Sequence, residues 1–202
     1  ISKTLEAVSF LNAQDFNLAN PGASKLEYRL TQYDTPQKFT AVSTYELPLG
    51  RGKALGKSIP AILDYVVGGW QLNGNLTLQK GFPIDFPNAA PVAARSAALP
   101  SDQRTIQKWF DTSLWTDPAT GRPVPAPAPF TLRTWPTRFP DVRFMTLKNL
   151  DLSLFKDLRI RERMRLNLRL ESYNVSNTPW FSSLATTNVT AANFGNLTLN
   201  QN

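Results

Sequence analysis

The stretch "RMRLNLRLESYNVSN" at residues 163–177 decides the fold, because its side chains alternate between two chemistries. In its first part every second residue is apolar: Met164, Leu166, Leu168 and Leu170. The residues between them are charged or polar: Arg163, Arg165, Asn167, Arg169 and Glu171. Successive side chains of a β-strand point to opposite faces, so this stretch predicts a strand with one apolar and one strongly polar face.

Three further runs repeat the alternation, and helical periodicity is scarce. They are "KFTAVSTYELP", "WQLNGNLTLQKG" and "LKNLDLSLFKD", which begin at residues 38, 70 and 147. We expect strands over residues 39–47, 70–79, 147–156 and 163–175. The charged stretch "FKDLRIRE" after Leu154 is expected to hold a tight turn, around residues 159–162. A short helix fits only at residues 59–67, where several apolar side chains share one side.

The length of these runs favours a lipid environment. Each run is about nine to eleven residues long, which is what a tilted strand needs to cross a bilayer, whereas soluble strands average about five or six. Aromatic residues gather near the ends of the runs, as in the aromatic girdles of membrane barrels. They are Phe39, Tyr45, Trp70, Phe82, Phe144, Tyr173, Trp180 and Phe181.

Composition excludes several kinds of site. The 202 residues include no cysteine and no histidine, which removes disulfides, thiolate chemistry, the commonest metal ligand and the commonest general base. We therefore expect no enzyme, no cofactor and no metal ion. The net charge of +7 is compatible with nucleic acid, anionic lipid or an acidic ligand. No apolar run reaches the roughly 18–20 residues of a membrane helix, and the missing start Met and basic leader suggest an internal start.

Three stretches invite other interpretations. "GRGKALGKS" at residues 50–58 lacks the first glycine of a phosphate-binding loop, because that position is Arg51, and we interpret it as a basic turn. "RTWPTRFPDVRF" at residues 133–144 could bind single-stranded nucleic acid, but an extracellular loop is favoured. Asp151 and Glu171 could form an acid/base pair, but a salt-bridge ladder with Arg165, Arg169 and Lys148 is favoured.

A family resemblance adds to this interpretation. The segments "FTAVSTYELPLGRGKALG", "VVGGWQLNGNLTLQKGFPIDF", "NLDLSLFKDLRIRERMRLNLRLESYNVSNTPWF" and "FGNLT" resemble the C-terminal part of TonB-dependent outer-membrane receptors, most closely Oar-like transporters with a carboxypeptidase-regulatory-like N-terminal domain. The resemblance covers most of residues 36–88 and 144–199. It implies a barrel of about 22 strands with an N-terminal plug and a segment that contacts TonB. Since plug, TonB box and closing strand are missing here, we expect a fragment.

The predicted fold class is therefore all-β: about four to five antiparallel transmembrane strands of a larger barrel. Residues 1–202 would form a single partial domain, with a long extracellular loop at residues 81–146. The resemblance implies the bacterial outer membrane and a role in energised uptake, with this chain forming barrel wall and ligand-facing loops. The implied partners are outer-membrane lipid, TonB through the missing part, the rest of the barrel and plug, and an unknown transported ligand, but no nucleic acid.

The resemblance also orients the chain. The turn around residues 159–162 and the link at 48–69 would be periplasmic, and residues 81–146 and 176–202 extracellular. Ligand contacts are expected from Trp109, Trp115, Trp135 and Arg138. Lumen-facing polar positions are expected at Asp151, Arg165, Asn167, Arg169 and Glu171.

Two alternatives remain open. One is a soluble β-sandwich that binds carbohydrate or another ligand, and the other is a structural strand-rich subunit of a larger membrane assembly. A sandwich would pack the leucine side chains between two sheets, whereas a barrel would expose them to acyl chains.

Overall fold

A computed structural model describes residues 3–8, 27–86, 90–124, 128, 135–161 and 164–199. The expected turn at 159–162 lies partly outside the described residues. The chain divides into two compact units. We call Phe39–Leu78 with Leu147–Thr178 the sheet unit, and Ile1–Lys38, Gln79–Thr146 and Pro179–Asn202 the loop unit.

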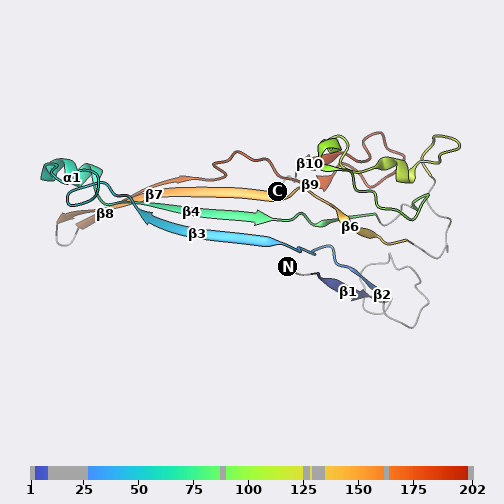
Figure 1. Ribbon diagram of the computed structural model, residues 1–202, viewed down its shortest axis with the longest axis horizontal. Coiled ribbons are helices and arrows are strands. Elements are labelled where there is room, and N and C mark those ends of the chain that lie inside the picture. The colour runs from blue at the N-terminus through green and yellow to red at the C-terminus, as the bar shows by residue number, and fades with distance from the viewer. Residues whose placement is uncertain are drawn as a thin grey trace. The chain divides into compact units, whose positions relative to one another are not determined.

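The sheet unit is built on one four-stranded sheet. Its strands are β3 (Lys38–Glu46), β4 (Trp70–Gln79), β7 (Leu147–Arg161) and β8 (Met164–Ser172), and they lie in the order β3-β4-β7-β8 (Figure 1). All four alternating runs of the sequence are therefore strands, and the expected all-β antiparallel fold class is confirmed.

The expected end of β7 was wrong. The strand does not end at Lys156 but continues through the "FKDLRIRE" stretch to Arg161, and β8 begins at Met164. The reason lies in the pairing: Leu154 faces Leu170, Lys156 faces Leu168 and Leu158 faces Leu166, so the partner strand holds this segment extended. Charge had suggested a turn, but the alternation runs through the charged residues as well.

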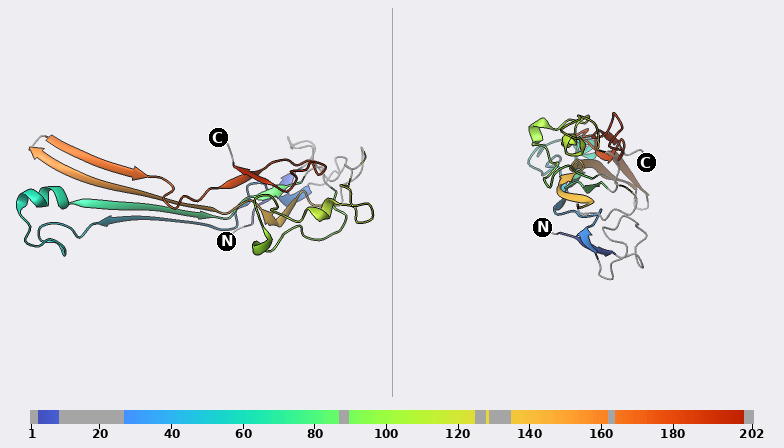
Figure 2. Two further views of the ribbon diagram at one scale, coloured as in Figure 1. Left: turned by 90° about the horizontal axis from the view of Figure 1, so that it is seen from above. Right: turned by 90° about the vertical axis from the view of Figure 1, so that its right-hand side faces the viewer.

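The short helix expected in the link before β4 is confirmed as α1 (Ala61–Val67). It lies at the end of the sheet where β4 begins (Figure 2). The N–H of Gly68 donates to the carbonyl of Asp64 at 2.8 Å and ends the helix. Among the described residues, no helix has both the length and the apolar character needed to cross a bilayer.

In its described residues, the loop unit contains three two-stranded sheets. β1 (Leu5–Val8) pairs with β2 (Glu27–Leu30), β5 (Pro83–Asp85) with β6 (Arg138–Arg143), and β9 (Phe181–Leu184) with β10 (Leu197–Leu199). Two 3-10 helices, η1 (Ser101–Gln103) and η2 (Thr112–Trp115), lie between β5 and β6. The region expected as one long loop at residues 81–146 thus carries its own strands and turns.

An aromatic core holds the loop unit together. Phe86 stacks on Trp115 with ring centroids 4.7 Å apart, and Phe110 meets both rings edge-on or close to it. Phe194 meets Phe110 and Trp115 in the same way. Buried aromatic side chains each remove large apolar areas from water, so this cluster can stabilise a unit with short strands. Its buried members are Ile84, Phe86, Ala97, Phe110, Leu114, Trp115, Phe139, Val142 and Phe194.

Two buried arginines on β6 tie the strand pairs together. Arg138 donates to Glu6 Oε1 at 2.7 Å, to the Leu30 carbonyl at 2.9 Å and to Asp85 Oδ2 at 2.9 Å. Arg143 donates to the Asp34 carboxylate at 2.5 Å. Both partners of this second pair are buried, so they need each other to avoid an uncompensated charge.

Candidate functional site

The apolar sides of the four long strands form one continuous surface, which we call the leucine face. Pairing puts the leucines of β8 beside those of β7. A side chain built on Gly74 of β4 would meet Ser43 of β3 and Leu152 of β7, so these strands share the same face. The exposed fractions are 44% for Leu166 and 69% for Leu170. These leucines are not packed between two sheets, which is the arrangement a β-sandwich requires.

Two lysines mark the limits of the apolar stretch of this face on β7. Alternation places Lys148 and Lys156 on the leucine face, with Leu150, Leu152 and Leu154 between them. Eight residues of strand span about 26 Å at roughly 3.3 Å per residue, which is close to the apolar band of an outer-membrane barrel. Lys148 was wrongly assigned to the polar ladder, since its parity puts it on the opposite face.

The polar residues expected to face a lumen lie together on the other side of the sheet. In the register of β7 and β8, Ser153 faces Glu171, Phe155 faces Arg169, and Asp157 faces Asn167. These pairs share the face that also carries Asp151 and Arg165 by alternation. Asn167 donates to Asp157 at 2.7 Å, so the strands are joined across this polar face by a side-chain hydrogen bond.

The salt-bridge ladder exists only in part. Arg169 pairs with Glu171 at 2.5 Å, but the Arg169 side chain is 58% exposed, so the pair adds little stability. Asp151 instead accepts hydrogen bonds from the Asn149 amide and the Asn174 N–H, both at 2.9 Å. The bond from Asn174 stabilises the turn after β8, where Asn174 has a φ of 48°. Within the described residues, no group of three or more acidic side chains is placed to hold a metal ion.

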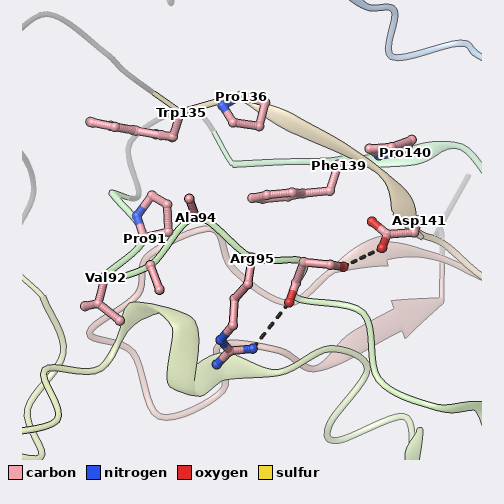
Figure 3. Close-up of a pocket in the computed structure, with 11 residues that line it drawn as sticks. Pro91, Val92, Ala94, Arg95, Trp135, Pro136, Phe139, Pro140 and Asp141 are labelled. Atoms are coloured by element: carbon pink, nitrogen blue, oxygen red, sulfur yellow. Dashed lines mark hydrogen bonds between the residues drawn. The ribbon is translucent and has the colours of Figure 1, made fainter.

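The loop unit contains a pocket of about 590 Å³ between residues 91–96 and 135–141. Trp135 and Phe139 present their rings to Pro91 and Ala94 across it (Figure 3). The indole Nε1 of Trp135 is buried and has no hydrogen-bond partner among the described residues. Aromatic and proline walls of this kind suit an apolar or ring-shaped ligand group.

Polar side chains edge the same pocket. Ser96 donates to Asp141 at 2.5 Å, and Arg95 reaches Asp111 at 2.8 Å. Burial by itself raises the pKa of Asp111, but hydrogen bonds from Ser113 and Arg95 and the charge of Arg95 outweigh it, so the pKa lies below its ordinary value of 3.8. Asp111 is therefore ionised near neutral pH and holds Arg95 at the pocket rim.

The four residues expected to contact ligand have different surroundings. Only Trp135 lines the pocket. Trp109 is half-buried and donates to the Arg143 carbonyl at 2.6 Å, while Trp115 is 1% exposed and belongs to the core. Arg138 is 5% exposed and bound to carboxylates of this chain, so Trp115 and Arg138 were wrongly expected to be available to a ligand.

Among the other pocket residues, Phe139 and Asp141 belong to the 133–144 stretch, but no pattern in the sequence linked them to Ser96. Their proximity depends on the pairing of distant segments. The available signal was the alanine-rich stretch at residues 90–94 with Pro91, since a proline ring stiffens the backbone.

Comparison with known proteins gives one match. A family model described as an outer membrane beta barrel domain matches residues 2–202. No curated protein and no solved structure matches the chain. The matched residues include segments of both units.

Proposed function

Because the chain belongs to the outer membrane beta barrel domain family, we propose that it forms part of the wall and the ligand-facing outer region of a TonB-dependent transporter. The family indicates the bacterial outer membrane as its location. Its work there is non-enzymatic: the strands enclose a transport path, and the loop unit meets the ligand.

The observation that carries this proposal is the sorting of side chains on the long strands. The leucines lie on one face, where those of β8 are exposed and those of β7 half-buried, while Arg165, Asn167 and Arg169 share the other. In hydrocarbon an arginine near the midplane costs about 2–4 kcal/mol, so a membrane strand must keep its charges on the lumen side. A strand facing bulk water would not need so strict a separation.

The edges of the sheet support a larger barrel. β3 and β8 are its outermost strands in the described part of the chain. Each presents a row of backbone N–H and C=O groups, which cannot remain unpaired within a bilayer. Further strands of the complete barrel would pair with both edges, in agreement with the resemblance to large transporters.

The loop unit supplies the ligand-facing part of the proposal. The resemblance assigns its segments at residues 81–146 and 176–202 to the cell exterior. In this unit, the pocket beside Trp135 has apolar walls and a polar rim. We propose it as the place where the transported compound is first held.

Uptake measurements test this function. Mass spectrometry would record which compounds disappear from the medium of cells that carry the complete protein, cells without it, and cells without TonB. We expect one set of compounds to be removed only when both are present. Trp135→Ala should reduce that uptake, whereas Trp180→Phe should leave it unchanged, because Trp180 does not line the pocket and donates to the Met145 carbonyl. Protein-dependent uptake that persists without TonB would refute the proposal.

A further inference from the structure

We propose that α1 and the basic turn before it, residues 50–58, form a docking surface for anionic phospholipid. The phospholipid belongs to the leaflet at the β7–β8 turn end of the sheet, which is the inner leaflet of the outer membrane. This inference rests on the proposed function, because it uses the lipid-facing assignment of the leucine face and the periplasmic assignment of the turn.

The first argument is the attachment of the helix to the leucine face. Lys156 lies on that face, yet it is only 4% exposed. Its ammonium donates to the carbonyls of Val66 at 2.9 Å and Gly68 at 2.5 Å, and lies 5.5 Å from the Trp70 ring centre. The Trp70 indole donates to the same Val66 carbonyl at 3.0 Å. These contacts place the end of α1 where the apolar stretch between the two lysines ends.

The second argument is the exposure of the helix. Its residues are apolar on nearly every side, and none is buried. The exposed fractions are 82% for Ile62, 52% for Leu63 and 63% for Val66. A helix of seven residues is marginal in water, and such an apolar patch needs a cover. The one charged residue, Asp64, is turned toward the basic turn and accepts the Arg51 N–H at 2.5 Å.

The third argument is charge. The basic turn carries Arg51, Lys53 and Lys57. Lys53 pairs with Glu46 at 2.9 Å, whereas Arg51 and Lys57 are exposed and form no ion pair within the described residues. Basic residues next to an inserted apolar helix are attracted to lipid phosphates, and together the two features bind more strongly than either alone.

A hollow between these elements suits a headgroup. It measures about 290 Å³ and is lined by the basic turn, α1 and β7. Its carboxylates are already engaged: Glu46 by Lys53, Asp64 by the Arg51 N–H, and Asp157 by Asn167. The Arg51 guanidinium therefore remains to bind a phosphate.

Spin labels test the proposal, since the 202 residues contain no cysteine and any cysteine elsewhere in the complete protein would be changed to serine. Single cysteines at Ile62, at Leu170 of the leucine face and at Ser101 of the loop unit would be labelled with a nitroxide. They would be introduced into the complete protein, reconstituted in vesicles of phosphatidylethanolamine and phosphatidylglycerol. We expect the labels at 62 and 170 to be accessible to oxygen and shielded from a water-soluble nickel chelate, and the label at 101 to show the reverse.

The charge argument has its own variants. Arg51→Ala with Lys57→Ala should shift the equilibrium of the label at 62 from lipid to water, by about fivefold for each basic residue removed. Lys108→Ala with Arg122→Ala, also exposed and basic, is the matched control and should change nothing. In vesicles of phosphatidylcholine alone the two basic-turn substitutions should have no effect.

Three results would overturn the proposal. The label at 62 could be open to the nickel chelate while that at 170 is shielded, in which case the lipid-facing sheet stands and the docking surface fails. Insertion that requires lipid A would assign the helix to the other leaflet. An equal effect of the basic-turn substitutions in phosphatidylcholine would exclude a role for anionic headgroups. If the label at 170 were itself in water, the proposed function would fall as well.

Discussion

Arg138 satisfies two carboxylates and one carbonyl with a side chain that is 3% exposed. Arginine at such a place binds carboxylates through a planar group with several donors, which lysine cannot imitate. From sequence, a cationic residue among aromatics suggested ligand contact. In the structure, Arg138 joins β1, β2 and β5 to β6, so its charge is paired with carboxylates of this chain.

Removing this guanidinium should weaken the loop unit. Arg138→Met leaves Asp85 without this partner and Glu6 with Arg29 alone, and since both carboxylates are partly exposed, we expect a cost of about 1–3 kcal/mol. Urea unfolding followed by tryptophan fluorescence measures the loss. Arg122→Met, at an exposed turn, should cost close to nothing. Equal stability of the two variants would show that Arg138 does not hold the strands together.

Acid should loosen the same connection. Burial of the Glu6 carboxyl raises its pKa, but the hydrogen bonds and charges of Arg29 and Arg138 together outweigh this and hold the pKa below its ordinary 4.5. The stabilisation is therefore complete above about pH 4.5 and is lost as the pH falls through the lower, folded pKa.

Glu6→Gln isolates this contribution. We expect the stability difference between the wild type and this variant to be constant from pH 7 to about pH 5, and to shrink at lower pH. Unfolding free energies measured across that range provide the check. A difference that grows on acidification would contradict the assigned sign.

At the scale of elements, β7 carries both the apolar stretch of the leucine face and the pairing with β8. Its fifteen residues carry the lysines at both ends of the apolar stretch and the register with β8. Alternation in the sequence predicted which residues share a face, because the period of two is a property of the extended backbone itself. The end of the strand was missed, because it depends on how long β8 offers hydrogen-bonding partners.

Leu152 and Ser153 provide a matched test of the two faces. Leu152 lies midway between Lys148 and Lys156 on the leucine face, so Leu152→Arg should cost about 2–4 kcal/mol in a bilayer. Ser153→Arg, one residue on and on the polar face, should be nearly neutral. The amount of each variant that assembles in outer membranes, followed by unfolding in lipid, gives the comparison. Similar costs at both positions would remove the basis for the lipid-facing assignment.

At the scale of the whole molecule, the question is which strands pair with the outer edges of β3 and β8. Amide hydrogen exchange on β8 tests whether its outer edge is paired. In the complete protein in lipid, we expect the β8 amides that point away from β7 to exchange slowly, because a further strand pairs with them. In the 202-residue chain in detergent, the same amides should exchange fast. Fast exchange in both would mean that β8 remains an edge.

The candidate site shows where sequence reasoning stops. In the sequence, Trp135, Trp109 and Trp115 all look like tryptophans of an exposed loop. In the structure, Trp135 lines the pocket, Trp109 is a half-buried hydrogen-bond donor, and Trp115 lies in the aromatic core. The difference arises from packing between segments that are far apart in the chain, such as Phe86, Phe110 and Phe194 around Trp115. No local pattern encodes which of three similar side chains will be enclosed.

By itself, the sequence determined the four long strands, the short helix and the division of each long strand into an apolar and a polar face. These follow from local geometry, because side-chain direction alternates along any extended chain. Only the tertiary structure decided that the described part of residues 81–146 packs with other segments of the loop unit, that Lys156 bonds to the end of α1, and that Arg138 is paired with carboxylates inside the loop unit. Those outcomes depend on which distant groups meet, and burial then makes each polar group require its partner.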